Sequence, residues 1–432
     1  MPVGRKTVYS RAMRISFKTF GCRLNQAESE RFSAVFSTAG WQIVSFATPS
    51  DVVVIHGCAV THTAELKCLQ LARNIKQGAR QAGQPEPWVV LVGCVVEAGG
   101  SSREVAGVDL LVARQDQERL LELVADRFGA PLVNPAAQSP LESPPRRKRA
   151  LLKVQDGCDF FCTYCIVPHT RGAPVSRPWQ VVLDEARALA QSGFSELVIA
   201  GCNVACYRDG GRNLADLLSA IAALDEVQRI RLSSIEPSTS EGEVIECMAV
   251  CHKLCRYLHL PLQSGDAGVL RSMGRTYTPE AFAATVRQAV RLIPDLGLGT
   301  DLITGFPGET REAFERTRQL VSELPFNNLH VFPYSERPGT PAIDFSGKVP
   351  PGERRERARL LQQLHVAKRL EFARRFVGRP VQVLVEGIGR DGRGHGWSGE
   401  YLECRMAGVG RTSIGSLITC TPIGVDEGAV LV

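Results

Sequence analysis

Apolar and polar positions follow two distinct periods over the first 130 residues. Short apolar runs at 15–20, 52–55, 89–92 and 108–112 predict β-strands, and amphipathic stretches at 25–38, 61–81 and 116–128 predict helices. Strands that alternate with helices are typical of a parallel sheet covered on both faces. We therefore expect residues 13–130 to form a doubly wound α/β domain, with Met13 as a candidate natural start.

The same alternation returns on a larger scale after a proline-rich break. Five prolines between 131 and 145 and the basic run 146–149 predict a linker over 131–149. Strands are then predicted at 151–155, 197–200, 230–235, 257–262, 298–303 and 329–334, with helices at 177–192, 279–292 and 310–324. Six strand–helix units over 150–350 favour an incomplete parallel barrel of the (βα)6 type, with its functional end at the C-terminal ends of the strands.

The rest of the chain combines one helix with a small all-β region. A basic helix is expected over 351–375, and its segment 353–375 holds eight Arg or Lys against three Glu, a net charge of +5. An apolar stripe predicts its buried face: Leu360, Leu361, Leu364, Ala367, Leu370 and Ala373. Apolar runs at 381–385, 399–405 and 416–420, separated by glycine-rich turns, predict a small β-barrel over 376–432.

Composition excludes several classes of protein. With 44% hydrophobic residues in 432, the chain can bury a large core, and general disorder is excluded. Since no apolar run approaches the roughly 18 residues of a membrane span and no secretory signal is visible, we expect a cytoplasmic protein without a membrane partner. The net charge of +6 is too small to indicate nucleic-acid binding by itself.

Three of the 14 cysteines follow the first predicted barrel strand with the spacing Cys158-x3-Cys162-x2-Cys165. Three thiolates can ligate three irons of a [4Fe–4S] cube and leave the fourth iron open. A zinc site that adds His169 is the alternative. S-adenosylmethionine can chelate an open iron, and with Tyr164 before the third cysteine the segment is identified as the radical S-adenosylmethionine signature.

A second set of three cysteines lies in the N-terminal domain. Cys22, Cys58 and Cys94 each follow a glycine just beyond a predicted strand, 36 residues apart each time. Strand C-termini meet at one rim of a doubly wound sheet, so these thiols are expected to converge there. Three unrelated buried cysteines are the alternative.

Together these features resemble the methylthiotransferase family over almost the whole chain. Segments 155–158, 231–237, 259–265 and 301–310 look like its shared motifs. The resemblance implies an α/β domain that carries an auxiliary [4Fe–4S] cluster, a radical barrel with a second cluster, a C-terminal TRAM (OB-like) barrel and S-adenosylmethionine as cofactor. It implies a transferase that delivers a methylthio group to an unactivated carbon after a 5′-deoxyadenosyl radical removes its hydrogen.

The resemblance also implies roles for particular residues. The cluster ligands would be Cys22, Cys58, Cys94, Cys158, Cys162 and Cys165, and the contacts to S-adenosylmethionine would be Tyr164, Gly201, Asn203, Ser234 and Glu236. Gly305 and Gly308 are either cofactor contacts or turn glycines. His56-Gly57 stands where the family usually has Asn-Thr, and Val95-Val96-Glu97 after Cys94 is also atypical. His56 is then either an extra ligand or, as we favour, a hydrogen-bonding residue.

The segment 330–340, HVFPYSERPGT, looks most like the branch that acts on N6-threonylcarbamoyladenosine in tRNA. Alternatives are the isopentenyladenosine branch and the branch that modifies an aspartate of a ribosomal protein. The implied partners are a tRNA anticodon stem-loop, an electron donor and a sulfur source. A non-catalytic iron–sulfur scaffold that binds RNA is the rival outside the enzyme class.

The other eight cysteines are expected to be structural. Cys247, Cys251 and Cys255 recur every fourth residue and would share one helix face, as a small-residue stripe or a metal site, and we favour the stripe. Cys202 and Cys206 follow the second barrel strand but are not assigned as ligands. The remaining three are Cys68, Cys404 and Cys420.

Overall fold

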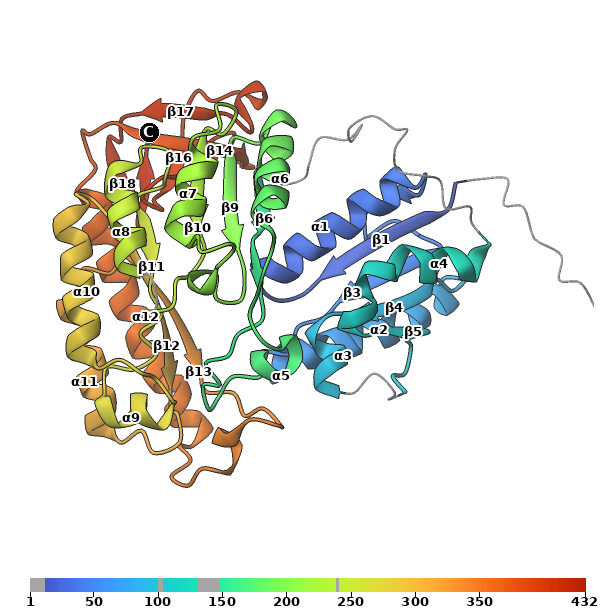
Figure 1. The fold of residues 1–432 in the computed structure, drawn as a ribbon, viewed down its shortest axis with the longest axis horizontal. Helices are drawn as coiled ribbons and strands as arrows, with labels where there is room; N and C mark the ends of the chain where they lie inside the picture. The colour runs from blue at the N-terminus through green and yellow to red at the C-terminus, as the bar shows by residue number, and fades with distance from the viewer. Residues whose placement is uncertain (1–11, 100–103, 130–147, 238–240) are drawn as a thin grey trace, which may run out of the picture. The chain divides into compact units, whose positions relative to one another are not determined.

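We describe the chain from a computed structural model that covers residues 12–99, 104–129, 148–237 and 241–432 (Figure 1). The chain forms two compact units. One comprises Met1–Pro145 with Cys165–Gly172, and the other comprises Arg146–Tyr164 with Ala173–Val432. Of the expected linker, residues 131–147 lie outside the described residues, and Arg149 already belongs to a strand.

The first unit contains a five-stranded parallel sheet in the order β2-β1-β3-β4-β5. Its strands are β1 (Arg14–Thr19), β2 (Gln42–Ile43), β3 (Val52–His56), β4 (Trp88–Val92) and β5 (Leu110–Val112). The four predicted strands are confirmed, and only the two-residue edge strand β2 was not expected. The order reverses at β1, which makes the sheet doubly wound with a switch point between β1 and β3.

Helices cover both faces of this sheet. They are α1 (Arg23–Thr38), α2 (His62–Gln81), α3 (Cys94–Gly99) and α4 (Leu120–Phe128), with the short α5 (Val167–Arg171) added from the segment Cys165–Gly172. Phe36 of α1 and Val124 of α4 pack with one set of strand side chains, and Ala72 of α2 packs with Val95 of α3 on the other set. The helix predicted over 116–128 is α-helical only from Leu120, because its first turns form the 3₁₀ helix η1 (Arg114–Arg119).

The second unit begins with the six predicted barrel strands. They are β6 (Arg149–Lys153), β9 (Glu196–Ala200), β10 (Arg229–Leu232), β11 (Tyr257–His259), β12 (Gly297–Thr304) and β13 (Asn328–Pro333). They pair in parallel as β6-β9-β10 and β11-β12-β13, and isolated bridges from Ile230 to Leu254 and from Ser234 to His259 connect the two halves. Among the described residues β13 does not pair with β6, so the barrel is open as expected.

Helices surround the barrel and bury one side of each strand. They are α6 (Trp179–Gln191), α7 (Leu214–Ala222), α8 (Glu241–Val250), α10 (Pro279–Leu292), α11 (Arg311–Glu323) and α12 (Pro351–Arg374), with the one-turn α9 (Ala267–Ser272) after β11. Leu197, Ile230, Leu258, Leu302 and Leu329 belong to one core with these helices. Because side chains alternate along a strand, the inner side of the barrel receives the intervening residues, many of which are polar.

A six-stranded sheet in the order β17-β14-β15-β16-β19-β18 completes the second unit. Its strands are β14 (Val381–Ile388), β15 (Gly394–Ser398), β16 (Glu403–Met406), β17 (Leu417–Cys420), β18 (Gly424–Asp426) and β19 (Ala429–Leu431). The strand predicted at 399–405 is wrong in its first half, because residues 399–402 form a turn in which Tyr401 has a φ of 68°. This region is the small β domain that the sequence predicts.

The buried face of α12 differs from the predicted apolar stripe. Ala367 is exposed, whereas the cations Arg354, Arg357 and Lys368 are buried. Each has a protein partner: Arg354 donates to the carbonyl of Tyr334, Arg357 pairs with Glu309, and Lys368 donates to the carbonyls of Ser322 and Leu324. A long cationic side chain can be buried when hydrogen-bond acceptors are available for its charged group. Hydrophobic periodicity does not predict such burial.

None of the described helices has the length and apolar character that crossing a membrane requires.

Candidate functional site

Cys22, Cys58 and Cys94 lie just beyond the C-terminal ends of β1, β3 and β4. Two of the glycines that precede these cysteines allow the ends of the strands to approach one another closely. A Cβ on Gly21 (φ +106°) would lie 2.6 Å from the Cβ of Cys58, and one on Gly93 (φ +95°) would lie 2.7 Å from the carbonyl oxygen of Gly57. Positive φ and such close backbone contact are available to glycine alone. The structure therefore brings the N-terminal cysteines to one rim of the sheet.

The three thiols share one electrostatic environment. Cys58 and Cys94 are buried, and Cys22 is exposed. Burial and, to a smaller extent, the charges of Cys22 and Cys94 raise the pKa of Cys58 to about 11, although a backbone hydrogen bond from Val60 opposes the rise. A buried thiol favours the protonated form, so binding of a metal ion by such thiols would release protons.

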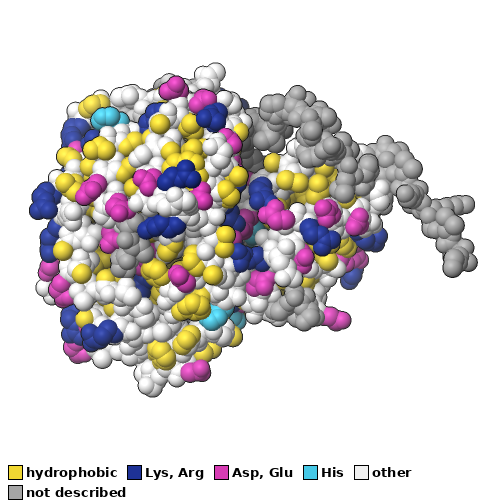
Figure 2. Space-filling view, viewed as in Figure 1, with side chains coloured by type: hydrophobic (Ala, Val, Ile, Leu, Met, Phe, Trp, Pro, Cys, Tyr) yellow, Lys and Arg dark blue, Asp and Glu magenta, His cyan; other side chains and the backbone are white. Residues whose placement is uncertain are grey.

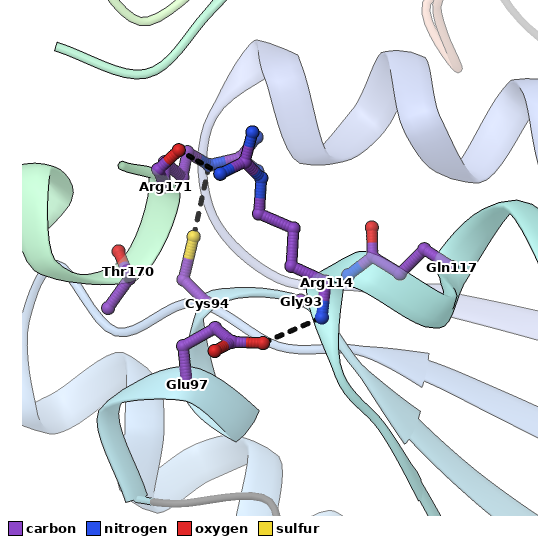
Figure 3. Close-up of a pocket in the computed structure, with 7 residues that line it drawn as sticks. All are labelled: Gly93, Cys94, Glu97, Arg114, Gln117, Thr170 and Arg171. Atoms are coloured by element: carbon purple, nitrogen blue, oxygen red, sulfur yellow. Dashed lines mark hydrogen bonds between the residues drawn. The ribbon is translucent and has the colours of Figure 1, made fainter. Parts of the chain in front are cut away.

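Arg171 of α5 places a guanidinium beside this group (Figure 3). Its Nε donates to Cys94 Sγ at 3.1 Å, and its terminal nitrogens donate to both carboxylate oxygens of Glu28 at 3.0 Å and to Asn25 Oδ1 at 2.8 Å. Burial raises the pKa of the Cys94 thiol, and Arg171 opposes that rise. Arg171 therefore offers one N–H and a positive charge to a thiolate at Cys94.

His56 lies beside the same glutamate. Its Nε2 lies 3.4 Å from Glu28 Oε2, and its Nδ1 lies 3.0 Å from the hydroxyl of Ser29. The ring also stacks on Phe32, with centroids 5.9 Å apart. His56 thus makes a hydrogen bond with Ser29 in this structure, and its role beside a cluster stays a prediction.

The second cysteine motif occupies the loop between β7 (Gln155–Asp156) and α5. Gln155 is fully buried and anchors this loop, because its Nε2 donates to the carbonyls of Asp156 and Gly157 at 2.7 Å. Arg275, which follows α9, donates to Cys162 Sγ at 3.3 Å and pairs with Glu236 at 2.6 Å. In each cysteine motif, therefore, one sulfur accepts a hydrogen bond from a buried arginine, and that arginine forms an ion pair with a glutamate.

Around this loop lie the residues predicted to contact S-adenosylmethionine. Asn203 is 4% exposed, and neither its Nδ2 nor its Oδ1 has a hydrogen-bond partner within the described structure. The buried hydroxyl of Ser233 is likewise unpaired there. Buried amides and hydroxyls are normally satisfied, so these groups fit a polar ligand such as S-adenosylmethionine. The neighbouring Ser234, which the sequence selected, is exposed.

The other predicted cofactor contacts have structural partners. A Cβ on Gly201 would lie 3.0 Å from Gln155 Oε1, so the glycine allows the two loops to meet. Tyr164 packs edge-on against Phe306. Burial raises the pKa of Glu236 to about 7, although Arg275 opposes that rise. Whether these residues contact the cofactor stays a prediction.

Sequence reasoning missed three groups in these sites: Arg171, Arg275 and Ser233. Arg171 lies only six residues after Cys165, so its proximity to a cysteine motif is visible in the sequence. A single arginine outside the motif does not by itself indicate a contact with a metal ligand. Arg275 reaches Cys162 from 113 residues away along the chain, and no local pattern predicts such a contact.

Three further side chains meet on the inner side of the barrel. His259 Nε2 and His330 Nδ1 lie 3.0 Å and 3.2 Å from the same oxygen, Oδ1 of Asp301. Within the described residues this is the only group of three His, Cys, Asp or Glu ligand atoms that all lie within 4.8 Å of one another. The N-terminal cysteine sulfurs are not such a group, so they are spread more widely than the roughly 3.8 Å that one tetrahedral zinc ion would require.

Several of the remaining cysteines have hydrogen-bond partners within the protein. The prediction that Cys247, Cys251 and Cys255 share a helix face is wrong, because α8 ends at Val250 and only Cys247 lies in it. Cys247 bonds the hydroxyl of Ser219 at 3.4 Å, and Cys255 is buried beside Glu196. Cys202 donates to Asp156 Oδ1 at 3.4 Å.

Charge on the surface is mixed rather than segregated. Figure 2 shows Lys and Arg side chains interspersed with Asp and Glu over the visible face. On α12, Arg359 pairs with Glu356 and Arg369 with Glu403, in addition to the buried cations. Arg354 and Arg375 also pair with acids outside the helix, Glu336 and Asp295, so much of the net +5 is compensated within the protein. The exposed cations of the helix include Arg355 and Arg374.

Two family models match the chain. The Radical SAM superfamily matches residues 152–321, and the Uncharacterized protein family UPF0004 matches residues 14–112. Among solved structures, the radical S-adenosylmethionine methyltransferase TsrM of Kitasatospora setae aligns with a TM-score of 0.57 over 77% of this chain and 75% of its own. At 16% identity that likeness shows the fold alone.

Curated relatives are much closer in sequence. The tRNA-2-methylthio-N(6)-dimethylallyladenosine synthase of Zymomonas mobilis subsp. mobilis is 36% identical over 388 residues, which is 86% of each chain. The threonylcarbamoyladenosine tRNA methylthiotransferase of Bacillus subtilis is 34% identical over 387 residues, 86% of this chain and 84% of its own. With relatives at this identity along most of its length, the chain belongs to the radical SAM methylthiotransferase family, whose enzymes are transferases that use two [4Fe–4S] clusters and S-adenosylmethionine.

Proposed function

We propose that this enzyme converts N6-threonylcarbamoyladenosine beside the tRNA anticodon to its 2-methylthio derivative. The observation that carries the proposal is the presence of two separate cysteine triads. In each triad one sulfur accepts a hydrogen bond from a buried arginine. Such a pair of sites suits an enzyme that both generates a radical and supplies sulfur. In this proposal the enzyme works in the cytoplasm with an external electron donor and sulfur source.

The two triads would hold the two clusters. Cys158, Cys162 and Cys165 would ligate the cluster that binds S-adenosylmethionine, and Cys22, Cys58 and Cys94 would ligate the auxiliary cluster. S-adenosylmethionine, when bound, supplies the methyl group and the radical that removes hydrogen from the substrate carbon. The protein's own contribution is to position these groups: Asn203 and Ser233 offer unpaired polar atoms to the cofactor, and Arg171 and Arg275 donate to ligand sulfurs.

The choice of substrate rests on the segment 330–340 rather than on overall identity. Relatives that act on dimethylallyladenosine and on threonylcarbamoyladenosine, by their names, are 36% and 34% identical to this chain, so identity does not separate them. The segment HVFPYSERPGT, which resembles the threonylcarbamoyl branch, places the polar His330 on the inner side of the barrel wall. A polar side chain there suits a substituent with hydrogen-bonding groups better than an apolar prenyl chain.

The nucleosides of tRNA from a deletion strain test this proposal. Mass spectrometry of digested tRNA is expected to show loss of 2-methylthio-N6-threonylcarbamoyladenosine and accumulation of its precursor. Complementation with the wild-type gene is expected to restore it, and complementation with Cys162→Ala is not. Loss of the isopentenyl derivative alone would overturn the choice of substrate, and no change in either nucleoside would overturn the proposed activity on tRNA.

A further inference from the structure

Two histidines and an aspartate meet on three adjacent barrel strands, and we call them the His–Asp–His group. His259 ends β11, Asp301 lies in β12, and His330 lies in β13, where it pairs in register with Asp301. Leu258 and Leu302, the neighbours of His259 and Asp301 along their strands, belong to the apolar core. Because side chains alternate between the two sides of a strand, the group projects to the inner side of the barrel.

The atoms of this group have the spacing of metal ligands. His259 Nε2 and His330 Nδ1, which we call the inner nitrogens, lie 3.0 Å and 3.2 Å from Asp301 Oδ1. One ligand atom from each of the three residues lies within 4.8 Å of the other two. A transition-metal ion with bonds of about 2.0–2.2 Å holds neighbouring ligand atoms about 3.0–3.4 Å apart. The two measured distances lie in that range, so binding an ion requires little movement of these side chains.

The hydrogen bonds within the group set a condition for binding metal. A carboxylate only accepts, so each inner nitrogen donates its N–H to Asp301. A metal ion replaces these two N–H groups, and each neutral imidazole then carries its proton on the other ring nitrogen, the outer one. The outer nitrogens, Nδ1 of His259 and Nε2 of His330, therefore each need an acceptor.

Tyr257 and Asn328 meet this condition. Tyr257 Oη lies 3.2 Å from His259 Nδ1, and Asn328 Nδ2 lies 3.4 Å from His330 Nε2 and 3.0 Å from Tyr257 Oη. When the amide of Asn328 is turned by 180°, its oxygen accepts from His330 Nε2 and from the Tyr257 hydroxyl. Tyr257 Oη then accepts from His259 Nδ1. Each outer nitrogen thus donates to a protein oxygen, as is usual for histidines that bind metal.

Gly299 makes room for these outer partners. It lies in β12 two residues before Asp301 and pairs in register with His259. A Cβ at this position would collide with Tyr257 Oη and His259 Nδ1. A glycine inside a strand often marks a close approach of another group, and here that group is the hydrogen-bonded pair of Tyr257 and His259.

We propose that the His–Asp–His group binds a divalent transition-metal ion of the class that includes Mn²⁺, Fe²⁺ and Zn²⁺. Two imidazole nitrogens and one carboxylate oxygen suit these ions, whereas Ca²⁺ and Mg²⁺ take oxygen ligands. The side chains of Asp301 and His330 are 25% and 45% exposed, so the remaining coordination positions are open to water or to an oxygen of another ligand. An ion held there polarises such an oxygen as a Lewis acid. The site shares no residue with either cysteine triad.

Binding of Mn²⁺ to the full-length, cluster-loaded enzyme tests the inference. Oxidised [4Fe–4S] clusters give no electron paramagnetic resonance signal, so the decrease in the signal of aqueous Mn²⁺ measures binding. The wild type is expected to bind one Mn²⁺ per chain, and Zn²⁺ is expected to displace it, because zinc binds nitrogen ligands more tightly than manganese does. Pulsed measurements on the bound Mn²⁺ are expected to detect coordinated histidine nitrogen. Asp301→Asn and His330→Gln are each expected to raise the dissociation constant by a factor of about ten or more.

Two further variants separate this site from nonspecific binding. Tyr257→Phe keeps all three ligands but removes the acceptor of His259 Nδ1, and it is expected to weaken Mn²⁺ binding about 10–100-fold. His252→Gln removes an exposed histidine outside the group and is expected to change nothing. Melting temperatures identify variants that fail to fold.

Two results would overturn the inference. One is a wild type that does not bind Mn²⁺ at one ion per chain. The other is wild-type affinity in folded Asp301→Asn and His330→Gln. In either case the three side chains form a hydrogen-bonded group only, and the proposed function, which does not depend on this ion, still stands.

Discussion

Arg171 Nε lies 3.1 Å from Cys94 Sγ, and the same guanidinium is clamped by both carboxylate oxygens of Glu28. The contact is buried and lies within the N-terminal unit, to which the segment Cys165–Gly172 belongs. An N–H donated to a thiolate stabilises its negative charge and therefore its binding to iron. Arg171 is thus a positioning residue for the proposed auxiliary cluster.

Replacing Arg171 by Gln should weaken the auxiliary cluster and leave the radical cluster intact. We expect iron affinity at this site to fall about 10–100-fold, the usual cost of losing a partner that hydrogen-bonds a metal ligand. The reduction potential of the auxiliary cluster should become more negative, because a positive charge is lost beside it. Bound iron measured against iron concentration gives the affinity, and electron paramagnetic resonance during a redox titration gives the potential. Arg31→Gln, at an exposed pair with Glu118, is the matched control, and an unchanged potential would contradict the assignment.

The two cysteine triads should be separable in function. Cys162→Ala is expected to abolish formation of 5′-deoxyadenosine, because the radical cluster would lose one of its three ligands. Cys58→Ala is expected to retain cleavage of S-adenosylmethionine and to stop insertion of sulfur. Chromatography of 5′-deoxyadenosine and of tRNA nucleosides from the same reactions measures both outcomes. The account of two clusters would be wrong if anaerobically reconstituted wild type bound only one.

The fold could be predicted largely from the sequence because its strands are short, apolar and bounded by turns. All six barrel strands and four of the five N-terminal strands occur where the pattern places them. The convergence of Cys22, Cys58 and Cys94 followed from the rule that parallel strands end at one rim. Both predictions depend only on the local hydrophobic pattern and on general rules of sheet topology, so a single sequence is enough to make them.

What could not be predicted depends on contacts between distant residues. The apolar stripe predicted for the basic helix does not include Arg354, Arg357 and Lys368, yet these cations are buried because carbonyls and carboxylates elsewhere in the chain accept hydrogen bonds from them. The unpaired amide of Asn203 and the circuit around Asp301 are also invisible to periodicity. The net charge of a helix therefore does not give the charge that it presents to solvent, because the sum counts cations without their partners.

Asn203→Ala should weaken binding of S-adenosylmethionine. The amide of Asn203 is buried with both polar atoms unpaired in the described structure, so the cofactor is the partner we expect for them. Loss of these hydrogen bonds should raise the dissociation constant about tenfold, since a hydrogen bond to a charged group contributes about 1.5–3 kcal/mol. Isothermal titration calorimetry of the cluster-loaded enzyme measures the change. Asn213→Ala, at the half-buried N-cap of α7, should leave that constant unaltered.

Glu196→Gln should destabilise the second unit and change its dependence on pH. Glu196 is fully buried and accepts from Arg231 at 2.7 Å, while Arg229 and Arg149 also pair with it. Arg229 and Arg231 in turn donate to the carbonyls of Gln382, Trp397 and Ser398, so this carboxylate joins the barrel to the C-terminal domain. Removing one partner of a buried ion pair typically costs about 3–5 kcal/mol.

The pH dependence follows from the pKa of this carboxyl group. Burial alone would raise the pKa of Glu196, but the three arginines lower it from 4.5 to about 2. A depressed pKa means that the unfolded chain binds the proton more tightly, so the stabilisation is complete above pH 4.5 and is lost as the pH falls toward 2. Urea denaturation at a series of pH values should show this acid slope in the wild type and a weaker one in Glu196→Gln. Glu315→Gln, at an exposed pair with Arg318, should retain the full slope, and equal slopes in all three proteins would contradict the role of Glu196.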